Sequence, residues 1–272
     1  MFERRFLSRF FLAALLTAAP AGAALAEDGG AGWFSGDWYL TLGASGFRAP
    51  RFEGDNDYLL GVSPIISIGR AGPAARFVSR NDSASFSLID NGGFRAGLAG
   101  KLIFGRSDSA SKDLTGIDPV RFGGEVGVFG EVYPSDWLRI RGEVRHGIRS
   151  HSGVVADFSA DAFYDVTPAV RLSAGPRVSF ASASYFDAFY GINATEAAAS
   201  GVAAYKPGGG TRAVGIGGAI DWKATDKLTT SVFTEYSRLM GPAAKSSLVQ
   251  QRGSRNQLLI GVSASYRFDF SL

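Results

Sequence analysis

Residues 120–149 read VRFGGEVGVFGEVYPSDWLRIRGEVRHGIR, and this stretch decides the fold. Apolar and charged side chains alternate up to Val132, pause at a turn signal in residues 133–136, and alternate again up to Arg149. Because successive side chains on a strand point to opposite faces, this period of two on both sides of a turn predicts a β-hairpin. Each arm approaches the roughly 9 to 11 residues that a tilted strand needs to cross a bilayer.

One face of this hairpin is apolar and the other is densely ionic. Glycines interleave with the ionic side chains, which suits a crowded barrel interior better than a freely solvated surface. A pattern of apolar side chains outward and polar side chains inward favours a transmembrane barrel over a soluble β-sandwich. The apolar face carries Val120, Phe122, Val126, Val128, Val132, Leu138, Ile140, Val144 and Ile148.

The start of the chain predicts a cleaved signal peptide over residues 1–26. A basic beginning precedes an apolar run at residues 10–19, and an A-x-A cleavage site ends at Ala26. We therefore expect the mature protein to begin at Glu27, to form one barrel domain over residues 27–272, and to reach the outer membrane of a Gram-negative cell. Removing three arginines and one glutamate with the leader lowers the formal net charge from +3 to +1, so the charge does not indicate a nucleic-acid partner.

Composition narrows the class further. The chain has no cysteine, which excludes disulfides and thiolate metal sites. No window reaches the 18 or more consecutive apolar residues of a membrane helix. A membrane protein without such helices must close its sheet into a barrel, because every backbone polar group in lipid needs a partner. The 36 glycines and 21 phenylalanines are typical of crowded barrel walls and aromatic girdles.

The alternation predicts an all-β, antiparallel, up-and-down transmembrane barrel of about 12 strands, an even number as in bacterial outer-membrane barrels. Pro64 implies a bulge or a local break in the second strand. Short turns fall on the side of the C-terminus, taken as periplasmic, and long connections fall on the other side, as in outer-membrane barrels. The predicted strands are 37–47, 58–69, 74–80, 84–89, 94–104, 120–132, 138–149, 154–166, 170–180, 212–222, 228–240 and 257–270.

Charged side chains on the inward face form a predicted lumen ladder. Neighbouring strands carry opposite charges, so the ladder is either a structural set of ion pairs that obstructs the lumen or a selective pore lining. For example, we expect Arg141 and Arg145 to pair with Asp157 and Asp161. The members are Arg121, Glu125, Glu131, Arg139, Arg141, Glu143, Arg145, Asp157, Asp161, Asp165, Arg171 and Arg177.

Signals for catalysis are weak. His146 precedes Ser150 by four residues, which on a strand separates the two side chains by roughly 13 Å, too far for a nucleophile and its base. Phosphate-binding loops and clusters with metal-ligand spacing are absent from the sequence. We therefore expect no enzyme activity, no cofactor and no metal.

The connection at residues 181–211 is the most distinctive stretch. It contains an aromatic-Asp-aromatic-Gly block followed by Ser-Gly, Tyr and Pro-Gly-Gly, and here the chain resembles the MipA/OmpV family of MltA-interacting outer-membrane proteins. A further family segment is matched by RLMG at residues 238–241, but the residues after it, from Pro242 to Ser247, depart from the family pattern. The block consists of Tyr185, Phe186, Asp187, Phe189, Tyr190, Gly191, Ser200, Gly201, Tyr205, Pro207 and Gly209.

The resemblance implies an outer-membrane barrel, in some members a scaffold that links a murein transglycosylase to a murein synthase. A narrow passive pore and a surface adhesin remain alternatives, and the expected partners are membrane lipid and those murein enzymes, with the barrel itself monomeric. The loop block is either an aromatic plug over the barrel mouth or a contact surface for a partner. In the plug, the aromatic side chains are buried and Asp187 is held by a lumen arginine or by backbone amides.

Overall fold

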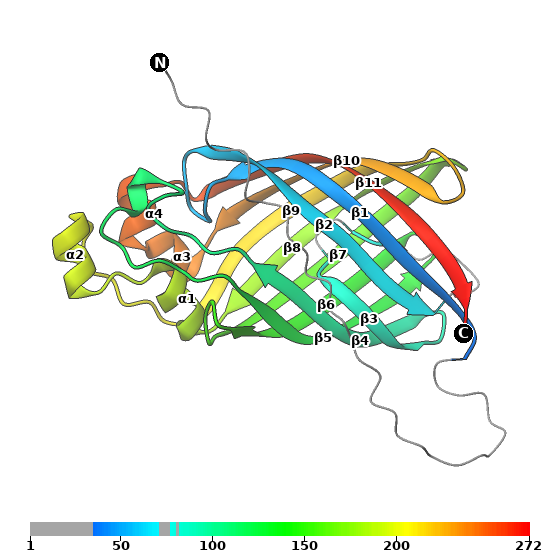
Figure 1. The fold of residues 1–272 in the computed structure, drawn as a ribbon, viewed down its shortest axis with the longest axis horizontal. Helices are drawn as coiled ribbons and strands as arrows, with labels where there is room; N and C mark the ends of the chain where they lie inside the picture. Colours follow the sequence, from blue (N-terminus) through cyan, green and yellow to red (C-terminus); the bar gives the residue numbers. More distant parts are fainter. Residues whose placement is uncertain (1–34, 71–76, 80–81) are drawn as a thin grey trace, which may run out of the picture. The chain divides into compact units, whose positions relative to one another are not determined.

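Strands close into an antiparallel β-barrel in the computed structural model, which describes residues 35–70, 77–79 and 82–272 (Figure 1). Glycine and small residues let neighbouring backbones approach inside the wall: a Cβ on Gly127 would lie 1.9 Å from the Val144 carbonyl oxygen. The strands are β1 (Asp37–Pro50), β2 (Tyr58–Arg70), β3 (Ala84–Asp90), β4 (Phe94–Ile103), β5 (Gly123–Ser135), β6 (Leu138–Ile148), β7 (Val154–Thr167), β8 (Val170–Ala181), β9 (Gly210–Lys223), β10 (Leu228–Leu239) and β11 (Asn256–Ser271).

The described part of the chain has 11 strands, so the prediction of about 12 was wrong. A closed barrel with an odd number of strands cannot be antiparallel throughout, so one pair of neighbouring strands must run parallel. That pair is β2 and β3, which share the single residue pair Ile68↔Phe86. Each other pair of neighbours is antiparallel, and β1 closes the barrel against β11.

The missing strand was predicted at residues 74–80, of which residues 77–79 are described. They adopt no strand. The Phe77 ring stacks on Phe163 with centroids 4.8 Å apart, and the Phe77 side chain is buried. Because these residues find their partners inside the barrel, their alternation does not place them in the wall.

The outer surface of the wall is an apolar belt. The alternation of β5 and β6 points Val126, Val128 and Val144 outward, each about half exposed. The last strand does the same with Ile260, Val262, Tyr266, Phe268 and Phe270, as expected from the sequence. Pro64 does not break its ladder, since β1 and β2 stay in register through the pair Ala44↔Pro64. No helix among the described residues is long and apolar enough to cross a membrane.

The two ends of the barrel differ. Short connections lie at the barrel end where the C-terminus lies: 91–93, 136–137, 168–169 and 224–227. The long connections 104–122, 182–209 and 240–255 all lie at the opposite end, which confirms the predicted asymmetry. The long connections, expected without secondary structure, fold into short helices at that end (Figure 1). They are η1 (Lys112–Leu114), α1 (Ala183–Tyr190), α2 (Ala194–Ser200), α3 (Gly241–Lys245) and α4 (Ser247–Arg252).

Candidate functional site: the filled lumen and the capped mouth

A buried ionic cluster fills the lumen beside β5, β6 and β7, and Glu131 lies at its centre. Its carboxylate accepts hydrogen bonds from Arg95 (2.9 Å), Arg141 (2.8 Å) and Arg139 (3.5 Å). The Glu131 side chain has no exposed surface, and the Arg139 and Arg141 side chains are almost as buried. One carboxylate thus holds three guanidinium groups in a restricted space, where a charge without a partner is costly.

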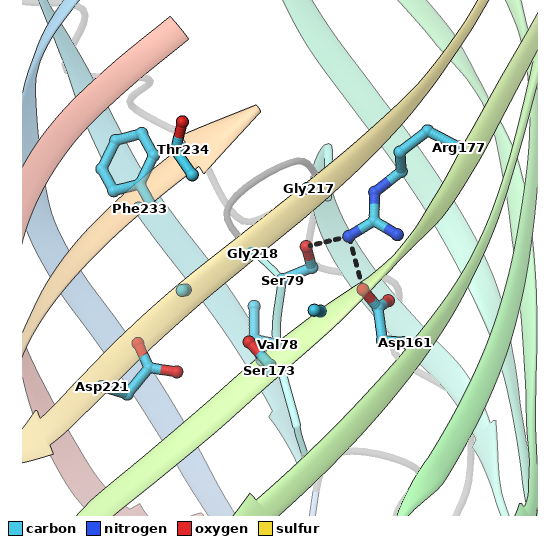
Figure 2. A pocket seen from close by; sticks show the side chains of 12 residues that line it. Val78, Ser79, Asp161, Ser173, Arg177, Gly217, Gly218, Asp221, Phe233 and Thr234 are labelled. Carbon is cyan, nitrogen blue, oxygen red and sulfur yellow. Dashed lines mark hydrogen bonds and ion pairs between the residues drawn. The ribbon is translucent and has the colours of Figure 1, made fainter. Parts of the chain in front are cut away.

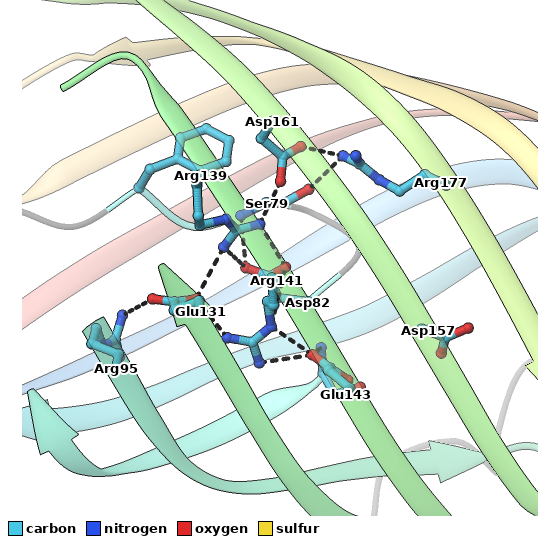
Figure 3. Close-up of polar contacts among 12 residues, drawn as sticks. Ser79, Asp82, Arg95, Glu131, Arg139, Arg141, Glu143, Asp157, Asp161 and Arg177 are labelled. Atoms are coloured by element: carbon cyan, nitrogen blue, oxygen red, sulfur yellow. Dashed lines mark hydrogen bonds and ion pairs between the residues drawn. The ribbon is translucent and has the colours of Figure 1, made fainter. Parts of the chain in front are cut away.

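Two described residues between β2 and β3, Ser79 and Asp82, are part of this cluster. Asp82 accepts hydrogen bonds from both terminal nitrogens of Arg139, at 2.6 and 3.0 Å, and Arg139 also donates to Asp161 at 2.6 Å (Figure 3). Ser79 accepts from Arg177 at 3.2 Å, and Arg177 also pairs with Asp161. The ionic cluster therefore joins Ser79 and Asp82 to side chains from three strands of the wall, β6, β7 and β8.

A second group of charges lies nearer the capped end. Arg145 pairs with Glu125 at 2.9 Å, and also with Glu143 and Asp157. Glu125 in turn accepts from the ring of His151 at 3.1 Å. These contacts join strands β5, β6 and β7 on their inward face.

The predicted ladder residues fall into three groups. Nine of them, Glu125, Glu131, Arg139, Arg141, Glu143, Arg145, Asp157, Asp161 and Arg177, meet in the lumen. Asp165 and Arg171 pair with each other at 2.6 Å near the short-turn end, where Asp165 is largely exposed. Arg121 lies before β5 in the connection 104–122 and is exposed, because the alternation of β5 begins only at Gly123, so its assignment to the ladder was wrong.

The expected pairing of the ladder was right in one case. Arg145 does pair with Asp157. Arg141 instead pairs with Glu131 on the preceding strand and with Glu143 on its own strand. Asp161 pairs with Arg139 and Arg177. Long arginine side chains reach along and across the ladder, so the register alone did not determine their partners.

The opposite part of the lumen carries small side chains at many inward positions, beside the larger Phe233 and Glu235 of β10. Inward positions of β9 and β10 carry Gly217, Ala219 and Ser231, and those of β11 carry Ser263 and Ser265. A pocket opens there beside Arg177 and Asp161 (Figure 2). Its free volume is about 10 Å³, room for roughly one water molecule.

The long connections form a cap at the mouth, built on the aromatic block of α1. Phe186 and Tyr190 have no exposed surface, and Tyr185 is also buried. They pack with Leu239 and Val249, which come from the β10 strand and from α4. The structure thus buries these aromatic side chains at the barrel mouth.

Polar contacts attach α1 to the barrel. The Tyr185 hydroxyl donates to Glu53 at 3.0 Å and accepts from Arg212 at 3.2 Å. Burial raises the pKa of Tyr185 and of Tyr190, so both hydroxyls stay protonated. Asp187, by contrast, is exposed and makes no ion pair with a described residue; only its backbone carbonyl accepts, from the Gly191 N–H at 3.1 Å. The expected clamp on Asp187 was wrong, because α1 turns that side chain away from the lumen.

The rest of the family block forms the outer layer of the cap. Gly201 ends α2 with a φ of 74°, a left-handed conformation that favours glycine. Tyr205 bridges back to Ile192, and its hydroxyl donates to the Pro242 carbonyl at 2.9 Å. Ser200 accepts a hydrogen bond from Arg252 at its carbonyl. Pro207 is buried, whereas Gly209 lies where a Cβ would be 3.3 Å from the Ala181 carbonyl oxygen.

Sequence reasoning missed several residues of this site. Glu53, Arg106, His151 and Arg212 lie in connections or at a strand end, where no alternation marks them as inward. Arg106 is buried against Phe52 and has no hydrogen-bond acceptor for its Nε. Burial also lowers the pKa of Arg106. The available signals were only positional: Arg106 and His151 each lie two residues beyond a predicted strand, and Arg212 begins one.

The sequence profile of the family described as "MltA-interacting protein MipA" matches residues 42–268. The chain belongs to the MipA family. This range includes β2 to β10 in full, most of β1 and β11, and the whole cap, so the ionic cluster and the aromatic block both lie within the MipA-family region. Comparison with curated protein sequences gives no match.

Solved structures similar to this MipA-family chain are outer-membrane proteins at low identity. Neisserial surface protein A is 9% identical, with 86% of this chain and 99% of that chain covered and a TM-score of 0.27. A bacterial polysaccharide outer membrane secretin is 8% identical, with 85% and 98% covered and a TM-score of 0.40. OprB of Pseudomonas putida is 14% identical, with 67% and 46% covered and a TM-score of 0.37.

The MipA-family chain is therefore a β-barrel of outer-membrane type, on the evidence of its closed wall, its apolar belt and its family. Among the described residues, no group of three or more His, Asp or Glu side chains could hold a metal ion. His146 points outward from β6, while Ser150 is buried beyond the end of that strand.

Proposed function

We propose that this MipA-family barrel is a non-catalytic scaffold of the outer membrane and not an open pore. The observation that carries the proposal is the double obstruction of the lumen. The ionic cluster around Glu131 and Arg139 fills one side, and the buried aromatic helix α1 covers the mouth. A pore needs a continuous water-filled path, whereas buried side chains occupy both the lumen beside β5 to β7 and the mouth of the barrel.

A scaffold must offer surface to partners, and this barrel leaves its two ends free for that. The family description names an interaction with MltA. We propose that this chain likewise docks a murein transglycosylase, and through it a murein synthase, at the end of the short turns. That end carries exposed charges of both signs, such as Asp226, Lys227 and Asp269, which suit a polar docking surface.

Location and processing form the first test. We expect the mature protein to begin at Glu27, although residues 26 and 27 lie outside the described residues. It should fractionate with the outer membrane and migrate differently on gels before and after heating, as a closed barrel does. N-terminal sequencing of the membrane fraction checks the cleavage site, and recovery as a soluble periplasmic protein would contradict the proposal.

Partner capture is the decisive test. Envelopes of cells that express the tagged full chain are crosslinked, and captured proteins are compared with those captured on a tagged unrelated barrel. Enrichment of a murein transglycosylase is the expected result. Absence of murein enzymes, together with enrichment of host surface molecules on intact cells, would favour an adhesin instead.

Conductance separates scaffold from pore. Purified barrel inserted into a planar bilayer should show no steady current, because the Arg139–Asp82 contact holds Asp82, which lies between β2 and β3, in the lumen. The double variant Asp82→Ala, Phe77→Ala serves as the matched comparison, since it removes two contacts that described residues between β2 and β3 make in the lumen. A large, steady conductance from the unaltered barrel would reverse the assignment and make the chain a narrow passive pore.

A further inference from the structure

Two exposed arginines lie on the outer face of the wall at its capped end. They belong to the four neighbouring strands β10, β11, β1 and β2 (Figure 1). The alternation of β1 points Arg48 outward with Leu42, and that of β10 points Arg238 outward with Val232. Arg238 pairs in register with Asn256, the first residue of β11. Both arginines are therefore part of the lipid-facing surface, close to the cap.

Each arginine lies beside a tyrosine of the same outer face. The guanidinium carbon of Arg48 is 4.2 Å from the centroid of the ring of Tyr58, the first residue of β2. Tyr236 precedes Arg238 by two residues and so shares its face, and its hydroxyl donates to Asn256 Oδ1 at 2.9 Å. Aromatic girdles of outer-membrane barrels lie at the boundary between hydrocarbon and head groups. The two arginines therefore lie at the level of the head groups.

Neither arginine has a carboxylate partner among the described residues. Asp57, the acidic residue directly before β2, pairs instead with Arg51 at 2.7 Å. At the opposite end of β11, Arg267 pairs with Asp269 at 2.7 Å, so that end neutralises its own cation. The capped end of these strands thus leaves cationic charge for an anion of the membrane, because exposed cations attract anionic head groups.

The wall below the arginines offers a surface to acyl chains. Leu60 and Val62 on β2 are 86% and 74% exposed, more than any other large hydrophobic side chain of the described strands, and Val262 on β11 is 59% exposed. Between the two valines lies Gly46 on β1, which pairs with both of them. A Cβ at Gly46 would meet no atom within 4 Å, so the apolar surface dips along β1 between two rows of larger side chains.

We propose that this face binds the lipid A part of lipopolysaccharide, a phosphorylated glycolipid with several acyl chains. The phosphates meet Arg48 and Arg238, and the acyl chains cover the surface around Gly46, between Val62 and Val262. Guanidinium groups suit phosphate because they donate paired, charge-assisted hydrogen bonds to its oxygens.

Charge complementarity selects this lipid over the other lipids of the membrane. Long connections mark the extracellular end of an outer-membrane barrel, so the two arginines face the outer leaflet, where lipid A carries the phosphates. A lipid with several acyl chains also covers several neighbouring strands at once. The site requires this orientation of the barrel but is independent of the proposed scaffold role.

Native mass spectrometry tests the contribution of the two arginines. Full-length barrel in neutral detergent is titrated with bisphosphorylated lipid A. The double variant Arg48→Gln, Arg238→Gln should bind about 30-fold more weakly, since each cation near an anionic head group contributes roughly fivefold. Lys206→Gln, which removes an exposed cation of the cap, is the matched control and should leave the affinity unchanged.

Heat-modifiable migration shows that each variant is folded. Unchanged binding by the double variant would overturn the proposal. An equal loss in the Lys206 variant would overturn it as well, because the attraction would then be a diffuse property of the whole capped end.

The chemistry of the lipid forms the second test. Lipid A without phosphates should bind the unaltered barrel as weakly as bisphosphorylated lipid A binds the double variant. Phosphatidylglycerol, an anionic lipid with two acyl chains, should also bind more weakly, and equal affinity would refute the assignment to lipid A. Gly46→Leu fills the dip on β1 while both arginines remain, so it should weaken binding several-fold, and unchanged affinity would contradict the placement of the acyl chains.

Discussion

The lumen and the cap close the same barrel with opposite chemistry. In the lumen, Arg139 and Glu131 are buried among other charges. In the cap, Phe186 and Leu248 are equally buried, but among apolar and aromatic neighbours. The lumen cluster comes mostly from strands adjacent in sequence, whereas one apolar cluster of the cap unites Phe52 with Leu248, which lie in the first and the last long connection.

This difference has energetic consequences. A buried charge depends on each of its partners, so removal of one carboxylate leaves several cations unsatisfied. An apolar core loses only the transfer and cavity terms of the atoms removed. The lumen should therefore be the more sensitive of the two to single substitutions, and the cap should yield locally without affecting the wall.

The largest effect is expected for Glu131→Gln. This variant keeps the shape of the side chain but removes the charge that faces Arg95, Arg139 and Arg141, and it should lower the free energy of unfolding by about 3–5 kcal/mol. Urea unfolding of the barrel in detergent micelles measures the change. A loss below about 1 kcal/mol would show that water already screens the lumen as it screens surface pairs.

Phe186→Ala should cost about 3 kcal/mol, since the side chain is fully buried in the cap. We expect this loss to be local, with faster proteolytic cleavage in the connection 182–209 and little change in the urea midpoint of the wall. Phe189→Ala is the matched control, because Phe189 is only half-buried and packs at the margin of the same cluster. Equal loss in both variants would contradict an organised apolar core.

The sequence allowed most of the wall to be predicted, because alternation is a local property that a strand shows residue by residue. The prediction failed at residues 74–80, where the sequence alternates like a wall strand, but the described residues 77–79 form no strand and Phe77 packs on Phe163 inside the barrel. Nothing in the local sequence pattern distinguishes a strand of the barrel wall from a segment packed inside the barrel. The parallel contact of β2 with β3 was beyond prediction for the same reason.

The candidate site was only partly predictable. Inward charges such as Glu125 and Asp157 follow from strand periodicity, and the aromatic content of α1 indicated burial. The partners Glu53 and Arg212 did not follow, since a contact across 159 residues of chain leaves no local trace. Among the helices of the cap, α3 and α4 were missed because each is shorter than two turns and is stabilised by packing on other elements, α3 on β9 and both on α1.

Ser246→Ala tests the part of the cap that departs from the family pattern. The Ser246 side chain is fully buried, and its hydroxyl donates to the Tyr190 carbonyl at 2.8 Å, which links α1 to the turn between α3 and α4. Loss of this bond should destabilise the cap by about 1 kcal/mol, measured as the increase in proteolysis of the connection 240–255. Gln250→Ala, which removes a longer 3.4 Å contact in the same connection, should have a smaller effect. The reverse order would mean that the loop packs by side-chain bulk alone.

The smallest effect is expected for Asp165→Asn, which breaks a pair of the same chemistry outside the lumen. Asp165 and Arg171 are 2.6 Å apart, but Asp165 is largely exposed at the short-turn end, where water and salt screen the pair. The variant should lose less than about 1 kcal/mol, and the loss should vanish when the salt concentration is raised to 1 M. The loss for Glu131→Gln should persist at the same salt, since buried charges are screened much less. If both losses fell together with salt, the lumen cluster would have to be in free exchange with bulk water, and the barrel would then be an open pore after all.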